Sequence, residues 1–159
     1  MGTESVNAVL QRHHFVAGFT PQHVAKLAPM ATRVRFERDQ IVFREGDDCH
    51  EFYLIVSGMI ALEISAPGQT FRVQTLGADH EFGWSALLMG AGKHFQARAL
   101  DRVEALAFDG GDLLAACKED PQFGFVFMQH LLGIVAERLQ ATRLQILDMY
   151  SPVAKRAGA

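Results

Sequence analysis

The chain has 159 residues, of which 49% are hydrophobic and 21% charged, and its formal net charge at pH 7 is −3. This length suffices for one domain with a sizeable core, and the composition is ordinary for a soluble globular protein. The small negative charge argues against a general nucleic-acid binder, which normally carries a basic face. Near a terminus the basic residues cluster only at Lys155-Arg156, too few to bind DNA alone. We therefore expect a single domain over residues 1–159 that makes no direct contact with nucleic acid.

The sequence carries no evident targeting segment. The N-terminus lacks an apolar core followed by a cleavage site, and no apolar run approaches the ~18 residues that span a bilayer. Cys49 and Cys117 lie far apart and have neither a metal-binding nor a redox spacing, so we interpret them as reduced thiols. These features predict a cytoplasmic protein that does not enter a membrane.

The first thirty residues have the pattern of helices. Apolar residues recur at helical spacing over residues 4–16, from Val6 to Val16. Thr20-Pro21 then supplies an N-cap followed by proline at the first helical position. The sequence predicts a helical N-terminal segment over residues 1–30.

From Ala31 the apolar period changes from that of a helix to that of a strand. Val34 and Phe36 alternate with charged neighbours, and short apolar runs follow, separated by Gly, Pro and Asp. Short strands at this spacing favour antiparallel pairing over parallel βαβ units. The prediction is an α+β fold, with an antiparallel β-roll (a double-stranded β-helix or jelly roll) over residues 31–108.

The remainder, residues 109–150, is predicted to be helical. A short helix has Asp112 near its start, and Asp120-Pro121 caps and begins a long helix. Apolar residues of the long helix follow the alternating three-four spacing of a coiled-coil seam, with one threonine among them. The seam comprises Phe125, Met128, Leu132, Val135, Leu139, Thr142, Ile146 and Met149.

A second apolar edge on the same helix consists of Phe127, Leu131 and Ile134. The first half of the helix must therefore pack on the domain, whereas the second half keeps mainly the narrow seam. Two alternatives remain for the seam: a homodimer through residues 125–149, or packing within one chain.

This order of elements resembles the cyclic nucleotide-binding domain family, and most closely the sensor half of regulators of the cyclic-AMP receptor protein type. The resemblance covers residues 15–150. It rests on "DQIVFREGDDCHEFYLIVSGMIAL", on "EFGWSALL" and "KHFQARALDRVEALAF", and on "AERLQATRLQ" in the long helix. It implies a small-ligand sensor without catalytic residues, whose ligand would be cyclic AMP or cyclic GMP, and a phosphate-binding cassette at residues 82–94.

The cassette has backbone features that suit an anion. Gly83 lets the backbone approach closely, and the N–H groups of Trp84, Ser85 and Ala86 open a helical turn. The side chain of Ser85 has two interpretations: it donates to a phosphate, or it caps its own turn.

The resemblance also places the family's side-chain contacts. Its phosphate-clamping arginine falls on Lys93, or on His94 if the loop shifts by one, and its ribose-binding glutamate falls on Trp84. Lysine lacks the planar fork of arginine and an indole only donates, so we expect altered or weakened nucleotide recognition. Trp84 either stacks on a base or fills the cavity. Thr142 either contacts a base or bonds to the carbonyl four residues earlier.

Three functions compete. The first is a stand-alone ligand sensor, or the excised sensor half of a transcription regulator; the second is an adaptor that dimerises but has lost nucleotide binding. The third, a metal or haem site, needs converging ligands. His50, His80, His94 and His130 are scattered through the sequence, so we expect no metal site and no enzyme activity.

Overall fold

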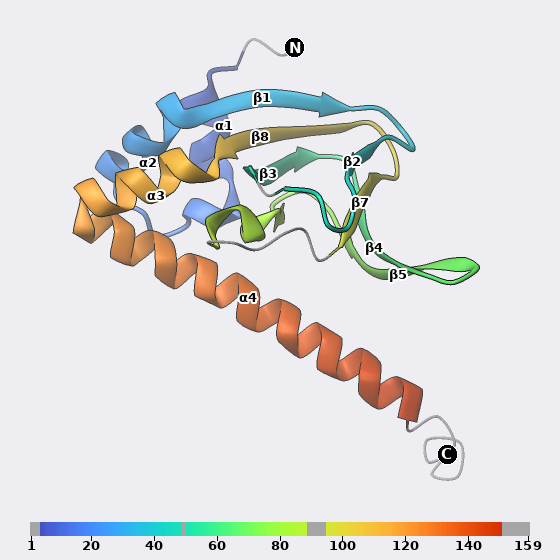
Figure 1. Ribbon diagram of the computed structural model, residues 1–159. Coiled ribbons are helices and arrows are strands. Elements are labelled where there is room, and N and C mark those ends of the chain that lie inside the picture. The colour runs from blue at the N-terminus through green and yellow to red at the C-terminus, as the bar shows by residue number, and fades with distance from the viewer. Residues whose placement is uncertain (1–3, 49, 89–94, 151–159) are drawn as a thin grey trace.

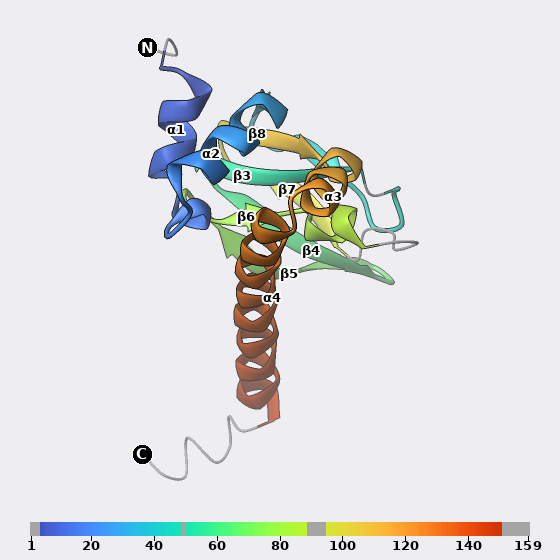
Figure 2. The same cartoon turned by 90° about the vertical axis from the view of Figure 1, so that its left-hand side faces the viewer.

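The computed structural model describes residues 4–48, 50–88 and 95–150. Two four-stranded antiparallel sheets form a roll, and helices α1, α2 and α3 gather at one end of it (Figure 1). Helix α4 crosses beneath the roll, and the two views agree that its C-terminal end extends beyond the strands (Figure 2). The predicted α+β roll with N-terminal helices and a long C-terminal helix is confirmed.

The N-terminal segment is helical, but in shorter pieces than the apolar spacing over residues 4–16 suggested. Helix α1 (Val6–Arg12) ends at His13, whose extended backbone separates it from the 3-10 turn η1 (His14–Val16). The predicted cap of the next helix, α2 (Pro21–Leu27), is present, because the Thr20 hydroxyl accepts a hydrogen bond from the His23 amide at 3.2 Å. A second 3-10 turn, η2 (Ala28–Met30), leads into the first strand.

The roll is built from eight strands. They are β1 (Ala31–Phe36), β2 (Ile41–Phe43), β3 (Glu51–Ser57), β4 (Ile60–Ala66), β5 (Gln69–Leu76), β6 (Glu81–Phe82), β7 (Gln96–Ala99) and β8 (Val103–Asp109). One sheet has the order β1-β8-β3-β6 and the other the order β2-β7-β4-β5. The turn at Ser57-Gly58 has Gly58 at φ 91°, where a Cβ atom would lie 2.4 Å from the Arg102 carbonyl oxygen. Only glycine fits this turn between β3 and β4.

Two apolar cores hold the domain together. One lies inside the roll, where the Tyr53 ring contacts the rings of both Phe36 and Phe82. The other lies between the sheet that contains β3 and the helices, where Phe15, Phe52 and Phe127 pack with ring centroids 5.3–6.2 Å apart. The second core fixes the start of α4 against the roll.

Both C-terminal helices begin as the sequence predicts. Asp109 accepts from the Asp112 amide at the start of α3 (Gly110–Glu119), and Asp120 accepts from the Phe123 amide at the start of α4 (Pro121–Tyr150). The predicted second edge of α4 is buried, whereas most of the seam is exposed, with Leu132 at 69% and Leu139 at 59%. No helix in the described part of the chain combines the length and apolar character needed to cross a bilayer.

His13 is buried at the junction between α1, η1 and strand β3. The Phe15 amide donates to its Nδ1 atom at 3.0 Å, so the proton is on Nε2, which donates to the Ile55 carbonyl at 3.0 Å. Both bonds require a neutral imidazole. Burial, the largest influence, lowers the pKa of His13 below the ordinary histidine value of about 6.5.

We therefore predict acid-dependent stability. A His pKa lowered by folding gives stability that is fully present above pH ~6.5 and is lost as the pH falls through the folded-state pKa. His13→Asn keeps an acceptor for the Phe15 amide but loses the bond to Ile55. It should lower the free energy of unfolding at pH 7 by about 1–3 kcal/mol and flatten its dependence between pH 7 and 5.

Urea unfolding of the two proteins at both pH values checks this prediction. His50→Asn, at an exposed position, is the matched control and should retain the wild-type slope. An equally steep slope in His13→Asn would show that another group controls the acid response.

Candidate functional site

The described part of the predicted cassette is a tight turn beside β6. Gly83 has φ 81° and begins the 3-10 turn η3 (Trp84–Leu87). The Ala86 amide donates to the Gly83 carbonyl at 3.0 Å and so closes the turn. An anion at this amide would have to compete with that bond. The amides of Trp84 and Ser85 are the other two predicted donors.

The turn is supported from below by the start of α3. A Cβ atom on Gly110 would lie 2.3 Å from the Ala86 carbonyl oxygen, so the two backbones touch. Ser85 and Leu87 are buried. The N-cap position of this turn is Gly83, which offers no side chain.

A pocket of about 280 Å³ lies between η3, the β4–β5 hairpin and α4. We call it the cassette pocket; its lining includes Leu62, Val73, Trp84, Phe95, Arg138 and Thr142. A small cavity of about 20 Å³ adjoins it at Gly83 and Ser85. The fold thus brings Gly83, Trp84, Ser85 and Thr142 together from positions far apart in sequence. Lys93 and His94 lie outside the described residues.

Thr142 makes the predicted bond to the carbonyl four residues earlier, and its position is also compatible with contact to a base. Its hydroxyl donates to the Arg138 carbonyl at 2.9 Å, the bond to the carbonyl four residues earlier that threonine often makes in helices. Its side chain also lines the cassette pocket. A ligand hydroxyl or base would have to compete with this bond.

Arg138 is the functional candidate that the sequence analysis missed. Its guanidinium lines the cassette pocket, donates to the backbone carbonyl of Glu81, and lies 3.7 Å from the Glu81 carboxylate. The only hint in the sequence is its position one helical turn before Thr142, inside the stretch "AERLQATRLQ".

The Glu81–Arg138 pair is largely removed from water. The side chains of Glu81 and Arg138 are 7% and 12% exposed. Burial raises the pKa of Glu81, against the opposing effect of Arg138. Burial likewise lowers the pKa of Arg138, with Glu81 opposing it. In both groups desolvation outweighs the attraction, so the pair is costly to bury.

Arg98 takes part in a buried network of the roll. Its Nε atom lies 3.1 Å from Oε1 of Glu63, and the Gln96 side-chain amide donates to the same oxygen at 3.0 Å. Glu63 is buried, so these donors compensate for its desolvation. Arg98 therefore serves the roll and does not line the cassette pocket.

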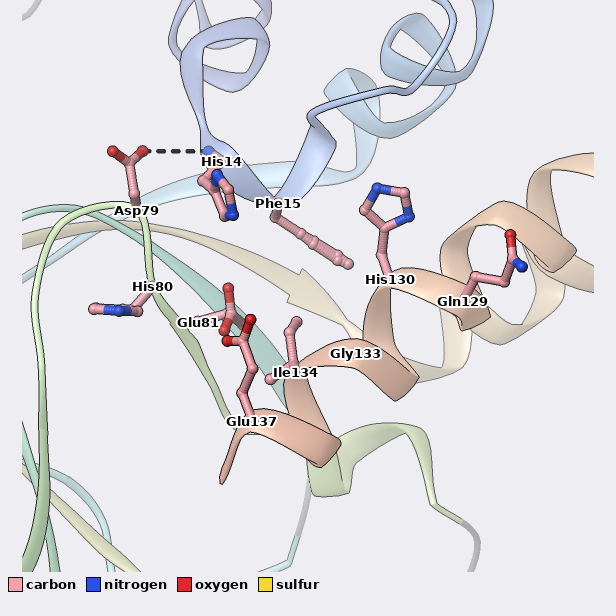
Figure 3. A pocket seen from close by; sticks show the side chains of 10 residues that line it. All are labelled: His14, Phe15, Asp79, His80, Glu81, Gln129, His130, Gly133, Ile134 and Glu137. Carbon is pink, nitrogen blue, oxygen red and sulfur yellow. Dashed lines mark hydrogen bonds between the residues drawn. The ribbon is translucent and has the colours of Figure 1, made fainter. Parts of the chain in front are cut away.

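A second and larger pocket, about 500 Å³, lies on the other side of the Glu81–Arg138 pair. We call it the acidic pocket; three carboxylates and three imidazoles line it, those of Asp79, Glu81, Glu137, His14, His80 and His130 (Figure 3). The expectation that the histidines remain scattered is wrong for His80 and His130, because the turn before β6 faces α4. No group of three or more His, Cys, Asp or Glu residues in the described part of the chain is arranged to hold a metal ion.

A family model described as "Cyclic nucleotide-binding domain" matches residues 33–120, which is more than half of the chain. The CRP-like cAMP-activated global transcriptional regulator of Mycobacterium tuberculosis is 25% identical over 145 residues, covering 91% of this chain and 63% of that protein. The chain spans between 31% and 63% of the length of the curated relatives that it matches.

Solved structures agree with the sequence match. The catabolite activator protein of Thermus thermophilus has a TM-score of 0.71 at 27% identity, covering 87% of this chain and 63% of that one. A cyclic nucleotide-binding domain from Methylobacillus flagellatus has a TM-score of 0.81 at 18% identity, covering 91% and 83% of the two chains. The second likeness concerns the fold alone.

Proposed function

Because the chain belongs to the cyclic nucleotide-binding domain family, we propose that it is a regulatory domain that binds a small anionic ligand in the cassette pocket. Ligand binding there would alter how α4 is attached to the roll, and the helix would transmit this change to a partner protein. On this proposal the chain acts in the cytoplasm as a regulator and not as an enzyme.

Arg138 is the observation that carries the proposal. Among the described residues that line the cassette pocket, it alone carries a positive charge. A guanidinium offers a planar fork that matches phosphate or carboxylate oxygens at two points. The same residue belongs to α4 and is tied to β6, so an anion that recruits Arg138 would alter the attachment of the helix to the roll.

The rest of the lining favours a ligand with a flat or apolar part. Trp84 and Phe95 flank the pocket together with Leu62, Val73 and Leu139. Aromatic side chains stack on nucleobases without regard to their identity. Trp84 replaces the family's ribose-binding glutamate and accepts no hydrogen bond from a hydroxyl. We therefore infer that cyclic AMP and cyclic GMP bind weakly, or that another anion is the natural ligand.

The exposed seam of α4 supports homodimerisation, and the dimer would transmit the response to the ligand. Phe125, Leu132, Leu139 and Met149 lie on one side of the helix and are all exposed in the single chain. Exposed apolar residues at alternating three-four spacing are typical of a helix that packs against a second helix. We propose a parallel or antiparallel pair of α4 helices over residues 125–149.

An adaptor without a ligand is the second candidate, and one observation favours it. Trp84 packs partly against the apolar core next to the cassette pocket, which is smaller than most pockets that hold drug-sized ligands. In that case the pocket is a packing defect that holds no ligand, and the dimerised α4 helix provides the surface that acts on a partner.

The ligand proposal predicts a response of Trp84, the single tryptophan of the chain. Titration with cyclic AMP or cyclic GMP should change the fluorescence of Trp84 saturably. The dissociation constant should lie above the nanomolar range. Arg138→Gln should weaken binding about tenfold or more, because it removes a charge-assisted hydrogen bond. Arg143→Gln, at an exposed position outside the pocket lining, should have no effect.

Two results would contradict the proposal. Nanomolar binding of cyclic AMP that is indifferent to Arg138 would show that the pocket works differently. The absence of any fluorescence change or heat up to millimolar nucleotide would favour the adaptor, unless another small anion gives a response that depends on Arg138.

The dimer proposal predicts that a single substitution in the seam changes the mass of the protein particle in solution. Wild-type protein should sediment as a dimer, and Leu139→Glu should be monomeric, because it places a carboxylate opposite its counterpart in the partner helix. Analytical ultracentrifugation measures both masses.

Gln140→Glu is the matched control, since it adds the same charge to the same helix at an exposed position outside the seam. It should remain dimeric. A dimer that persists in Leu139→Glu would place the interface elsewhere, and a monomeric wild type would assign the seam to a different partner.

A further inference from the structure

Three side chains line both parts of the cassette site. Trp84, Phe95 and Arg138 line the cassette pocket of about 280 Å³ and also the small cavity of about 20 Å³ that adjoins it. They come from separate parts of the fold: Trp84 from η3, Phe95 from the residue before β7, and Arg138 from α4. The two cavities thus share one guanidinium and two aromatic side chains.

The remaining walls of the cassette pocket are mostly apolar. The β4–β5 hairpin and α4 contribute four aliphatic side chains, those of Leu62, Val73, Val135 and Leu139. Among the described residues that line the pocket, none carries a negative charge. Apolar walls favour a ligand with little polar surface beyond the group that meets Arg138, because a polar group that is buried without a partner is unfavourable.

The Arg138 guanidinium has more N–H donors than it uses. Among the described residues, its side chain donates a hydrogen bond only to the Glu81 carbonyl. The Glu81 carboxylate lies 3.7 Å away, beyond hydrogen-bond distance, and does not line the cassette pocket. The Arg138 side chain is only 12% exposed, so water replaces the missing acceptors poorly. A carboxylate in the cassette pocket would supply two oxygens that match the guanidinium fork.

We propose that the ligand of the cassette pocket is an aryl carboxylate, a flat aromatic ring joined by a short chain to a carboxylate. This inference rests on the function proposed above, the binding of a small anion in this pocket. The carboxylate accepts hydrogen bonds from Arg138, and the ring packs against Trp84 and Phe95.

A cyclic nucleotide suits the same walls less well. Its charge could also meet Arg138, so the difference lies in the rest of the molecule. A ribose hydroxyl needs a hydrogen-bond acceptor, and the Thr142 hydroxyl in the lining already donates to the Arg138 carbonyl. Gln74 is the other polar side chain that the described lining of the larger cavity offers. A volume of about 280 Å³ is at the lower end of small-molecule sites, which favours a ligand with few rings.

The test is calorimetric titration of the full chain with hydrocinnamate at low salt, followed in parallel by Trp84 fluorescence. Hydrocinnamamide is the neutral probe of the same shape, and propionate is the anion without the ring. Hydrocinnamate should bind saturably and change the fluorescence of Trp84. The other two probes should bind at least about tenfold more weakly, since one lacks the charge and the other lacks the apolar surface.

Substitutions in the pocket should separate the two contacts. Arg138→Gln should weaken hydrocinnamate binding about tenfold or more, because it removes a charge-assisted hydrogen bond. Arg138→Lys keeps the charge without the fork and should bind with intermediate affinity. Phe95→Leu should weaken binding about three- to tenfold, because it removes a ring contact and keeps an apolar side chain. Arg143→Gln and Phe71→Leu, at exposed positions outside the pocket lining, are the matched controls and should bind as the wild type does.

Four results would overturn the inference: equal binding of hydrocinnamamide, equal binding of propionate, binding that is unaffected by Arg138→Gln, or binding that leaves the fluorescence of Trp84 unchanged. Cyclic AMP, titrated under the same conditions, separates this inference from the function on which it rests. If cyclic AMP binds through Arg138 and hydrocinnamate does not bind at millimolar concentration, the proposed function stands and the aryl carboxylate is overturned. If neither binds, the inference is overturned and the adaptor is favoured.

Discussion

The contact between Glu81 and Arg138 joins the two halves of this molecule. Glu81 belongs to β6, immediately before the cassette, and Arg138 belongs to the middle of α4. The guanidinium meets both the carbonyl and the carboxylate of Glu81, so it fixes where the helix crosses the roll. Upstream of this contact α4 is held by the aromatic core around Phe127; downstream the Gln145 side-chain amide donates to the Val73 carbonyl of β5, and the seam residues are exposed. The pair thus ties the middle of the helix to the domain.

The pair is not explained by stability alone. Desolvation raises the pKa of Glu81 and lowers that of Arg138, so each charge would be better solvated in the unfolded chain. Well-packed apolar residues often stabilise a fold as much as a buried ion pair does. A pair that is costly to bury, between a strand and a long helix, suits a helix that can occupy two positions. A ligand that binds one member of the pair can release the helix from the strand. Both pockets meet at this pair: Glu81 lines the acidic pocket and Arg138 lines the cassette pocket.

Local patterns predicted much of this architecture. The caps at Thr20 and Asp120 are visible in the sequence because a side chain bonds to an amide three residues later. The strand runs depend on an equally local alternation of apolar and polar residues. The apolar spacing in α4 separates the buried edge from the exposed seam, and the structure agrees with both.

The missed features depend on contacts between distant residues or on local competition. Arg138 and Glu81 are 57 residues apart, so no spacing rule links them. His80 and His130 converge only because the turn before β6 faces α4. The helix of the first segment stops at His13 because that ring bonds to Phe15 and Ile55 instead of continuing the apolar face. Trp84 lies in the segment predicted as the cassette, but its half-buried position could not be derived without the fold.

The central claim is that a ligand in the cassette pocket acts on α4 through Arg138. Amide hydrogen exchange along α4, measured with and without saturating cyclic nucleotide, tests it most directly. The account predicts a change of exchange in residues 135–150 that is absent in Arg138→Gln at ligand saturation. Residues 123–131, where the helix packs on the aromatic core, should be unchanged. Bound nucleotide that leaves the exchange of α4 untouched would contradict it, and would reduce the Glu81–Arg138 pair to a structural contact.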